Sequence, residues 1–278
     1  MKRIISVLLM ATLIAAMALG VAACGGKDSA PAQSAGSAAA SVEEAAFTTV
    51  EAGKLHMATN AAFPPYEMLA DDGISYEGID VEIATEIAKM LGLTLVVDDM
   101  DFSSVITAVQ EGKSDIAMAG LTVTDERKLN VDFTNTYAKG IQVIIVKEGS
   151  SIVDVDGLEG AKIGTQEGTT GYNYCSAAPE DGGYGEDNVV AYQNGATAIQ
   201  ALLNGQVDCV VIDNEPAKAF VSANAGLKIL ETEFANEDYA IGVSKENNEL
   251  LNEVNNALKT LIDNGTVQKI VDKYITAE

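Results

Sequence analysis

Two segments of this chain share one layout, and that layout restricts the fold more than any other feature of the sequence. AVQEGKSDIAMAG and ALLNGQVDCVVID each pass from a helical pattern through a glycine and an aspartate into a short apolar strand. Gly112 and Gly205 are 93 residues apart, and so are Asp115 and Asp208. Two lobes built on one plan would produce this echo, and chance similarity between two helix–strand connections is the alternative.

Strand and helix patterns alternate along the rest of the chain, which is typical of an α/β fold. Apolar residues at helical spacing fill the stretch from Asp80 to Leu91, and Gly92 ends it. The other predicted helices cover 103–111, 171–177, 196–204, 248–264 and 267–275. The predicted strands cover 54–59, 93–97, 116–119, 161–165, 189–192 and 207–212.

The carboxyl ends of the predicted strands are where a binding site is expected. In open α/β sheets, ligands bind in the crevice beyond these ends. The rule selects residues 119–124 in one predicted lobe and 212–215 in the other. If the lobes face each other, both segments line one cleft.

The N-terminus has the layout of an export signal. Lys2 and Arg3 precede an apolar stretch, and the small residues Val21-Ala22-Ala23 precede Cys24. This arrangement resembles the lipobox of bacterial lipoproteins, in which the cysteine receives diacylglycerol; an ordinary signal peptide with an incidental cysteine is the alternative. Two acyl chains hold a protein stably at a membrane. We therefore expect a signal peptide (1–23), a lipidated Cys24 with a flexible Ala-, Ser- and Gly-rich tether (24–46), and anchoring at the outer face of the cytoplasmic membrane.

The charge balance excludes some partners and leaves the ligand open. The chain carries 17 Lys and Arg against 41 Asp and Glu, and loss of Lys2 and Arg3 with the signal leaves 15 against 41, a net charge of −26. Such a charge repels nucleic acid and anionic lipid head groups. We therefore expect no nucleic-acid partner, and membrane contact through the lipid anchor alone.

The cysteines and the histidine do not indicate a cofactor. Besides Cys24 the chain has only Cys175 and Cys209, neither in a CxxC spacing, and His56 is the single histidine. This set does not form a zinc or redox motif, so no metal and no cofactor are expected. Whether Cys175 and Cys209 form a disulfide stays open.

Arg127 is the most distinctive charged residue near a predicted strand end. Thr124 is a plausible N-cap for a helix that begins at Asp125, and Arg127 would lie in its first turn. A guanidinium offers paired donors that match a carboxylate, and helix N-termini favour anions. A surface salt bridge is the alternative interpretation.

Three further features could belong to a site. The loop from Gly164 to Gly171 lies between a strand and a helix and could form an anion nest, but it lacks the Lys-Ser/Thr ending of a P-loop. Asp213 ends an apolar strand, where it could balance an ammonium group or cap the turn before Pro216. Aromatic residues in loops after strands could contact a ligand, with core packing as the alternative for Phe102; these are Phe63 and Phe102.

Taken together, the motifs resemble those of bacterial solute-binding protein family 3, the polar amino-acid receptors of ABC importers. The resemblance extends from about Leu55 to Tyr274, and the segments DFSS and AMAGLTVTDERK are particularly similar to those of its glutamine-binding members. The motifs that carry it are ATNAAFPPYE, GIDVEIATEIAKMLG, DFSSVITAVQEGKSDIAMAGLTVTDERK, VDFTNTY, GTQEGTTGY and VIDNEPA.

The resemblance implies a two-lobed, periplasmic-binding-protein-like type II fold. Each lobe would be a mostly parallel sheet flanked by helices, with two crossover strands as a hinge. Lobe 1 would comprise 47–140 plus 238–278, and lobe 2 would comprise 141–237. The implied ligand-binding residues are Asn60, Phe63, Phe102, Gly120, Thr122, Arg127, Gln166, Thr170 and Asp213.

In this family pattern, Arg127 would bind the ligand's α-carboxylate with help from Thr122 and Thr170. The Gly120 carbonyl, the Thr122 hydroxyl and Asp213 would bind the α-ammonium. Phe63 and Phe102 would flank the ligand side chain, with Asn60 near its tip. Relatives that bind glutamine or basic amino acids tend to have Asp in place of Asn60, Gln166 replaces an expected lysine, and Ile212 replaces a histidine, so the ligand is not fixed. A polar, uncharged amino acid is favoured, with arginine or lysine next.

Competing functions follow from the same resemblance. We expect an amino-acid receptor that serves ABC permease subunits and is not an enzyme. A ligand sensor that acts in trans is one alternative. Another is an enzyme similar to cyclohexadienyl dehydratases, which have the same fold, with Glu215 or Glu167 as a cleft acid; no GxSxG motif is present.

Overall fold

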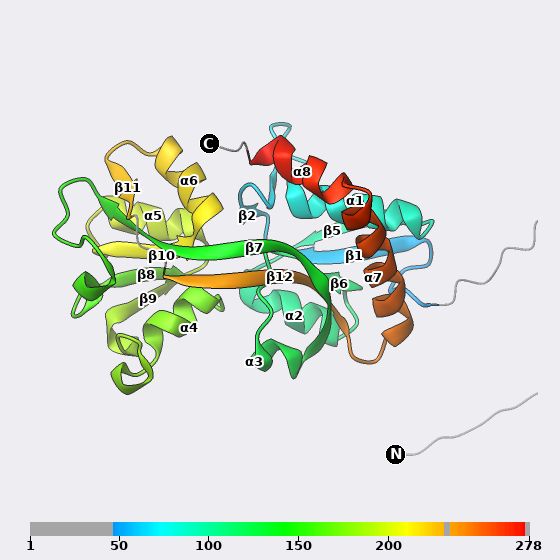
Figure 1. The fold of residues 1–278 in the computed structure, drawn as a ribbon, viewed down its shortest axis with the longest axis horizontal. Coiled ribbons are helices and arrows are strands. Elements are labelled where there is room, and N and C mark those ends of the chain that lie inside the picture. Colours follow the sequence, from blue (N-terminus) through cyan, green and yellow to red (C-terminus); the bar gives the residue numbers. More distant parts are fainter. Residues whose placement is uncertain (1–46, 231–233, 276–278) are drawn as a thin grey trace, which may run out of the picture. The chain divides into compact units, whose positions relative to one another are not determined.

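A nine-stranded sheet runs through the described part of the chain, with helices packed on it (Figure 1). The computed structural model describes residues 47–230 and 234–275, which all belong to one compact unit. The predicted signal peptide (1–23) and the predicted tether with Cys24 (24–46) lie outside the described residues. Among the described residues, no helix has the length and apolar character needed to cross a bilayer.

One end of the sheet is built from parallel strands, as the alternating pattern predicts. β1 pairs in parallel with β5 on one side and with β6 on the other. Between β1 and the first helix, three short strands form a separate antiparallel sheet. The strands of this end are β1 (Lys54–Thr59), β2 (Ala62–Phe63), β3 (Glu67–Leu69), β4 (Tyr76–Glu77), β5 (Thr94–Asp99) and β6 (Ile116–Ala117). Its helices are α1 (Ile79–Met90), α2 (Phe102–Gln110), α3 (Asp125–Lys128), α7 (Asn248–Asp263) and α8 (Thr266–Tyr274).

The other end repeats the parallel arrangement. β8 pairs in parallel with both β9 and β10. Its strands are β8 (Ile163–Gln166), β9 (Val189–Tyr192), β10 (Cys209–Asp213) and β11 (Leu227–Ile229). Its helices are α4 (Thr170–Ser176), α5 (Gly195–Leu203) and α6 (Asn214–Ala223), with short 3-10 turns at Val155–Leu158, Pro179–Asp181 and Glu186–Asn188.

Two long antiparallel strands connect the ends. β7 (Val131–Lys147) has 17 residues, and β12 (Ala235–Ser244) pairs with it along the middle of the sheet. At about 3.3 Å per residue, β7 spans roughly 55 Å. β12 also pairs with β6, whereas β7 also pairs with β10 and β11. Figure 1 shows β7 and β12 side by side between the two ends. The strand order is therefore β5-β1-β6-β12-β7-β10-β8-β9.

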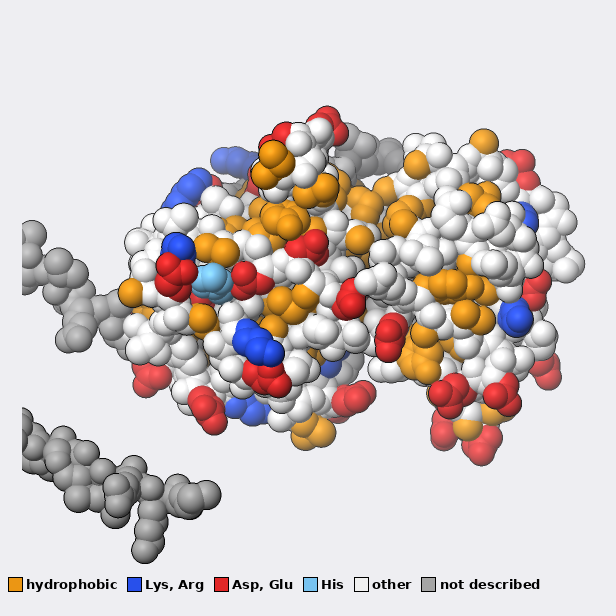
Figure 2. All heavy atoms as spheres, turned by 180° about the vertical axis from the view of Figure 1, so that it is seen from behind, with side chains coloured by type: hydrophobic (Ala, Val, Ile, Leu, Met, Phe, Trp, Pro, Cys, Tyr) orange, Lys and Arg blue, Asp and Glu red, His pale blue; other side chains and the backbone are white. Residues whose placement is uncertain are grey.

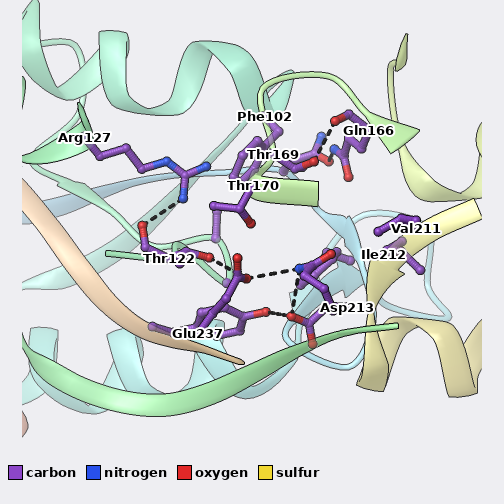
Figure 3. A pocket seen from close by; sticks show the side chains of 16 residues that line it. Phe102, Thr122, Arg127, Gln166, Thr169, Thr170, Val211, Ile212, Asp213 and Glu237 are labelled. Atoms are coloured by element: carbon purple, nitrogen blue, oxygen red, sulfur yellow. Dashed lines mark hydrogen bonds between the residues drawn. The ribbon is translucent and has the colours of Figure 1, made fainter. Parts of the chain in front are cut away.

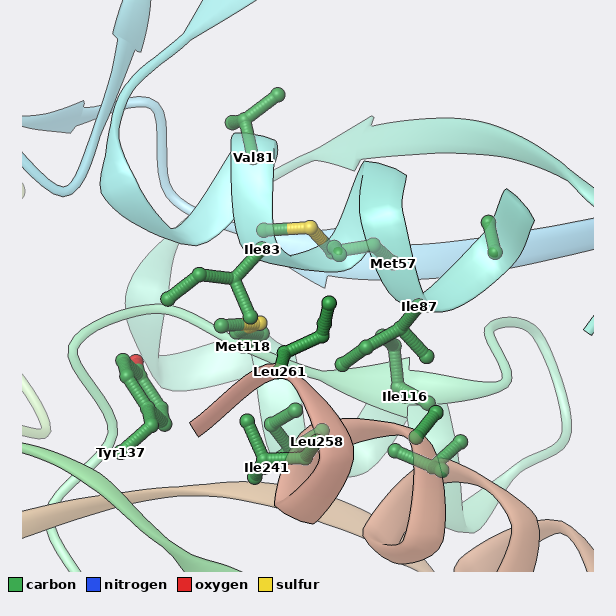
Figure 4. Close-up of a cluster of buried hydrophobic side chains, with 14 of the residues drawn as sticks. Met57, Val81, Ile83, Ile87, Ile116, Met118, Tyr137, Ile241, Leu258 and Leu261 are labelled. Atoms are coloured by element: carbon green, nitrogen blue, oxygen red, sulfur yellow. The ribbon is translucent and has the colours of Figure 1, made fainter. Parts of the chain in front are cut away.

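Buried apolar side chains form separate clusters at the two ends. Two clusters take all their buried members from residues 55–137 and 239–270, and two others take theirs from 143–230. The largest packs α1 and α7 against β1 and β6, with Met57, Ile83 and Leu258 fully buried between them (Figure 4). Burial of each such side chain contributes about 1.5–3 kcal/mol. Each end thus has its own core.

Polar caps explain where several helices begin. The Thr124 hydroxyl accepts a hydrogen bond from the Arg127 amide at the start of α3, as predicted. Thr169 caps α4 and Asn194 caps α5 in the same way. Each cap satisfies an amide that has no acceptor within its own helix. These caps fix the loops that follow β8 and β9.

Some element boundaries differ from those that the sequence predicts. The strand expected at 93–97 runs from Thr94 to Asp99, because Asp99 pairs with Thr59 and its carboxylate accepts from the Ala61 amide at 2.8 Å. The turn expected before Pro216 is the start of α6. Pro216 is the third residue of that helix, where its missing N–H would have no helical acceptor.

The cysteines and acidic residues have ordinary structural places. Cys175 and Cys209 are buried free thiols in one apolar cluster, and burial raises the pKa of each to about 12.

Acidic side chains are scattered over the face seen in Figure 2 and do not form one patch. They therefore indicate a solvated surface.

Candidate functional site

One pocket collects every residue that the sequence assigned to ligand binding. It lies among β10, the N-termini of α2, α3 and α4, and the crossing strands β7 and β12 (Figure 3). Its volume is about 30 Å³, counted as the space open to the centres of water molecules. The lining residues are Asn60, Phe63, Phe102, Ala119, Gly120, Thr122, Arg127, Gln142, Gln166, Thr169, Thr170, Val211, Ile212, Asp213, Glu237 and Tyr239.

Arg127 is buried in this pocket, so the alternative of a surface salt bridge is wrong. The residue is 8% exposed, and its side chain donates to the Thr122 carbonyl at 2.8 Å and the Gly168 carbonyl at 3.0 Å. The guanidinium carbon lies 5.4 Å from the centre of the Phe102 ring. Burial lowers the pKa of Arg127 and the nearby Glu237 carboxylate opposes that shift, but a guanidinium stays charged at neutral pH. A buried cation held by neutral carbonyls can attract an anionic ligand group.

Asp213 reaches the pocket from the carboxyl end of β10. It is 2% exposed, and its Oδ2 accepts from the Tyr239 hydroxyl and, at 3.4 Å, from the Gln142 amide. Its Oδ1 is buried without a hydrogen-bond partner among the described residues. Burial raises the pKa of Asp213 to about 7, and the charge of Glu237 adds to the rise. An ammonium group at Oδ1 would satisfy this atom and favour the ionised form.

Gly120 and Thr122 follow β6, where the strand-end rule placed them. Gly120 has a φ of +54°, and a Cβ there would lie 2.7 Å from the Phe63 ring, so only glycine suits this close approach. The Thr122 hydroxyl donates to Glu237 Oε2 at 3.0 Å. Thr170 is the first residue of α4, so its amide belongs to the donors that have no helical acceptor.

Asn60 and Gln166 meet across the pocket. The Gln166 amide donates to Asn60 Oδ1 at 3.0 Å and to the Gln193 carbonyl at 3.3 Å. Asn60 in turn donates to the Met100 carbonyl at 2.8 Å. The two neutral side chains therefore connect the loop after β1 with the end of β8.

The sequence did not identify three polar lining residues, which lie on the crossing strands. Gln142 comes from β7, and Glu237 and Tyr239 come from β12. The Gln142 amide donates to Glu237 Oε2 at 3.1 Å as well as to Asp213. VDFTNTY marked part of β7, but nothing in the sequence placed 142 and 237 beside Asp213. Thr169 lies within the Gly164–Gly171 loop that the sequence proposed as an anion nest, and Val211 lies directly before the predicted segment 212–215.

Side-chain hydrogen bonds connect the groups that line the pocket. These hydrogen bonds form one connected chain (Figure 3), which runs in order through Thr122, Glu237, Gln142, Asp213 and Tyr239. The pocket lining has one cation, Arg127, and two carboxylates. A ligand with both an anionic and a cationic group could replace these internal contacts and pair both charges, which lowers the desolvation penalty of burial.

Other residues considered from the sequence lie elsewhere. Glu167 and Glu215 are not among the lining residues, and the Glu215 carboxylate pairs with Lys218 at 3.1 Å. His56 lies on β1 with Nδ1 3.1 Å from an Asp98 oxygen. Within 47–230 and 234–275, no group of three or more His, Cys, Asp or Glu side chains could hold a metal ion.

The sequence is similar to known amino-acid-binding proteins. It is 32% identical over 228 residues to the arginine-binding extracellular protein ArtP of Bacillus subtilis, which covers 81% of this chain and 87% of that protein.

Two solved structures of arginine-binding proteins also match this chain. An ancestral arginine-binding protein bound to arginine matches with a TM-score of 0.74 and 40% identity, over 80% of this chain and 98% of that one. An ancestral arginine-binding protein bound to glutamine matches with a TM-score of 0.74 and 38% identity, over 81% and 99%. The family model of the bacterial extracellular solute-binding proteins, family 3, matches residues 55–277. This chain therefore belongs to the bacterial extracellular solute-binding proteins of family 3.

Proposed function

We propose that this protein is an extracytoplasmic receptor that captures one free amino acid and delivers it to an ABC importer. One observation carries the proposal: Arg127 and Asp213, which come from opposite ends of the sheet, line the same pocket. The two charges match the two ends of a zwitterion. Membership of the family and the printed functions of the relatives support this assignment.

The proposed binding mode assigns each end of the ligand to one group of residues. Arg127, with the Thr122 and Thr170 amides, binds the α-carboxylate. Asp213, the Gly120 carbonyl and the Thr122 hydroxyl bind the α-ammonium. Because a zwitterion is expensive to bury unless both charges are paired, it binds only where both sets are present.

We further propose that binding closes two lobes. Lobe 1 comprises 47–140 plus 238–278 and lobe 2 comprises 141–237, so both boundaries fall within the crossing strands β7 and β12. The separate cores at the two ends support this division. Contacts divided between the lobes favour the closed form when the ligand is present.

The ligand side chain is proposed to be polar and uncharged. The amides of Asn60 and Gln166 offer neutral donors and acceptors, whereas both carboxylates lie with Thr122 and Tyr239, where the ammonium is expected. Arginine or lysine is the second candidate, and Glu237 is the observation that favours it. With Arg127, Asp213 and Glu237 all ionised, the pocket carries one excess negative charge that a cationic amino acid would balance.

A calorimetric screen of the common amino acids tests the proposal. We expect at least one ligand to bind, and Arg127→Ala and Asp213→Ala each to abolish that binding. Lys128→Ala is the matched control, because Lys128 is exposed, pairs with Asp125 and does not line the pocket. Binding that survives both pocket substitutions, or no binding by the unmodified protein, contradicts the proposal.

Glu237→Gln separates the two ligand classes. If Glu237 balances a cationic side chain, the change weakens arginine or lysine binding at least about tenfold more than binding of a neutral amino acid. If Glu237 faces only the ammonium, both classes weaken equally.

We propose that Cys24 anchors the receptor to the outer face of the cytoplasmic membrane. Its position directly after Val21-Ala22-Ala23 supports this. In a bacterial host, Cys24→Ser should move the protein from the membrane fraction to the medium or periplasm. A variant that stays in the membrane fraction contradicts lipid anchoring.

A further inference from the structure

Two carboxyl groups outside the pocket are completely buried next to each other. Glu67 on β3 and Asp80 in the first turn of α1 are both 0% exposed. The backbone brings them together, because the Asp80 amide donates to the carbonyl of Tyr66, the neighbour of Glu67, at 2.9 Å. The charge of Asp80 raises the pKa of Glu67. Neither residue lines the pocket.

The pair lies directly behind the binding loop. Asp80 Oδ2 accepts from the Gly120 amide at 2.8 Å and from the Tyr137 hydroxyl at 2.7 Å. Gly120 lines the pocket, and Tyr137 lies on the crossing strand β7. Asp80 therefore connects helix α1, the loop after β6 and a crossing strand through one oxygen atom.

The remaining oxygens of the pair lack donors unless a proton is present. Asp80 Oδ1 and both oxygens of Glu67 are buried without a partner when both groups are ionised. A proton on Glu67 turns one of these oxygens into a donor and satisfies the Asp80 carboxylate. Burial raises the pKa of Glu67 well above its usual range, and the Asp80 charge adds to the rise. Burial raises the pKa of Asp80 to about 6, and the hydrogen bonds from Gly120 and Tyr137 limit this rise. Asp80 accepts two hydrogen bonds, which favour its ionised form, and Glu67 accepts none, so a single proton is more favourable on Glu67.

The surroundings offer no cation to replace that proton. In the described part of the chain, no lysine, arginine or histidine is among the groups that shift the pKa of either carboxyl. The titratable groups that face the pair are Asp99 at the end of β5, Tyr66 before β3 and Tyr137 on β7. All are neutral or negative, so loss of the proton would leave adjacent buried negative charges.

We infer that Glu67 and Asp80 share one proton and act as a positioning unit that fixes the Gly120 peptide for ligand binding. This inference rests on the proposed function, in which the Gly120 carbonyl accepts from the ligand ammonium. The ionised Asp80 holds the Gly120 amide, and protonated Glu67 holds Asp80. Tyr137 connects the same oxygen to β7, so the geometry of the loop is tied to a strand that joins the two ends of the sheet.

The first test detects the proton without a ligand. The test uses an Asp213→Asn background, because Asp213, with a pKa of about 7, would contribute its own band. In that background the infrared carbonyl band of a protonated carboxylic acid should be present in the folded protein at neutral pH, and Glu67→Gln should remove it. Glu86→Gln is the matched control, because Glu86 lies on the same helix α1 but pairs with Lys89 at the surface. In the Asp213→Asn background, absence of the band, or its persistence after Glu67→Gln, overturns the shared proton.

The second test measures whether the pair positions Gly120. A glutamine amide can donate to Asp80 as protonated Glu67 does, so Glu67→Gln should keep amino-acid affinity within about threefold, whereas Glu67→Leu should weaken it at least about tenfold. The Gly120 amide resonance should keep its chemical shift in Glu67→Gln and move in Glu67→Leu. Thermal unfolding shows whether Glu67→Leu is folded. If that variant does not fold, Tyr137→Phe, which removes the other donor to Asp80 Oδ2, replaces it and should move the same resonance.

A pH series separates positioning from a merely structural role. Above neutral pH the unmodified protein should lose affinity relative to Glu67→Gln as the shared proton leaves; the ratio of the two dissociation constants cancels titration of the ligand itself. A ratio that does not change with pH overturns the inference. If no amino acid binds the unmodified protein, the proposed function fails, and the infrared band and the Gly120 resonance still decide whether the proton is shared.

Discussion

Asp213→Asn should stabilise the ligand-free protein while it abolishes ligand binding. The carboxylate is 2% exposed, its Oδ1 has no partner among the described residues, and its pKa is raised from 3.8 to about 7. A carboxyl group whose pKa is higher in the folded protein binds protons more tightly there. Its contribution to stability therefore falls as pH rises from about 4 to about 7, the reverse of the usual case for aspartate.

The size of this effect follows from the two pKa values. With 3.8 in the unfolded chain and about 7 in the folded one, ionisation of Asp213 lowers the free energy of unfolding by about 4 kcal/mol at pH 8. By pH 5 less than half of this loss has occurred. The unmodified protein should thus lose about 2–3 kcal/mol between pH 5 and pH 8 from this group, and Asp213→Asn should not.

Urea denaturation of both proteins at about pH 5 and about pH 8 measures the difference. Every other titrating group is present in both proteins, so the comparison isolates Asp213 to the extent that its neighbours keep their own pKa values. An asparagine still accepts from Tyr239, which keeps the hydrogen bond of the native site. The reasoning is refuted if the stability gain of Asp213→Asn is the same at both pH values, or if the variant is the less stable protein at pH 8.

Three other predictions concern residues around the same pocket. Gly140→Ala should destabilise the protein by about 1–3 kcal/mol and weaken ligand binding, because the new Cβ would lie 2.5 Å from Asp213 Oδ2. Thermal unfolding measures the first effect and calorimetry the second, and unchanged stability and affinity would contradict the packing argument. Phe102→Leu should reduce amino-acid affinity about three- to tenfold by removing the ring 5.4 Å from the Arg127 guanidinium carbon, and unchanged affinity would show that the contact is not significant. Thr124→Ala removes the cap of α3 and should reduce the free energy of unfolding by about 1 kcal/mol in urea titrations, with an unchanged midpoint as the contrary result.

The sequence predicted those parts of the fold that local patterns determine. Period-3.6 apolar spacing located α1 and α7, and a glycine after four of the six predicted helices marked the end, as at Gly92 and Gly265. The strand-end rule then brought Gly120, Thr122 and Asp213 to one region, although they are far apart in the chain. These predictions succeeded because each depends on a short segment and on general rules for α/β sheets.

The crossing strands and the pocket residues that they supply could not be predicted in the same way. Half of β7 is polar or exposed and half is continuously buried, so it has neither a clear period of two nor a single apolar run. Gln142 and Thr122 donate to the buried Glu237, and these contacts depend on pairing between segments about 100 residues apart. Helix α6 was missed because Pro216 resembles a stop signal when the cap before it is unknown.

The position of Gln142, Glu237 and Tyr239 on β7 and β12 has a mechanical consequence. Both polypeptide connections between the ends of the sheet pass through the pocket wall. Any solute that displaces the Gln142–Glu237 hydrogen bond therefore acts on the backbone segments whose torsion angles set the orientation of the two ends. A permease that contacts only the outer surfaces would detect that reorientation without touching the cargo, so one docking geometry would serve cargoes with different side chains.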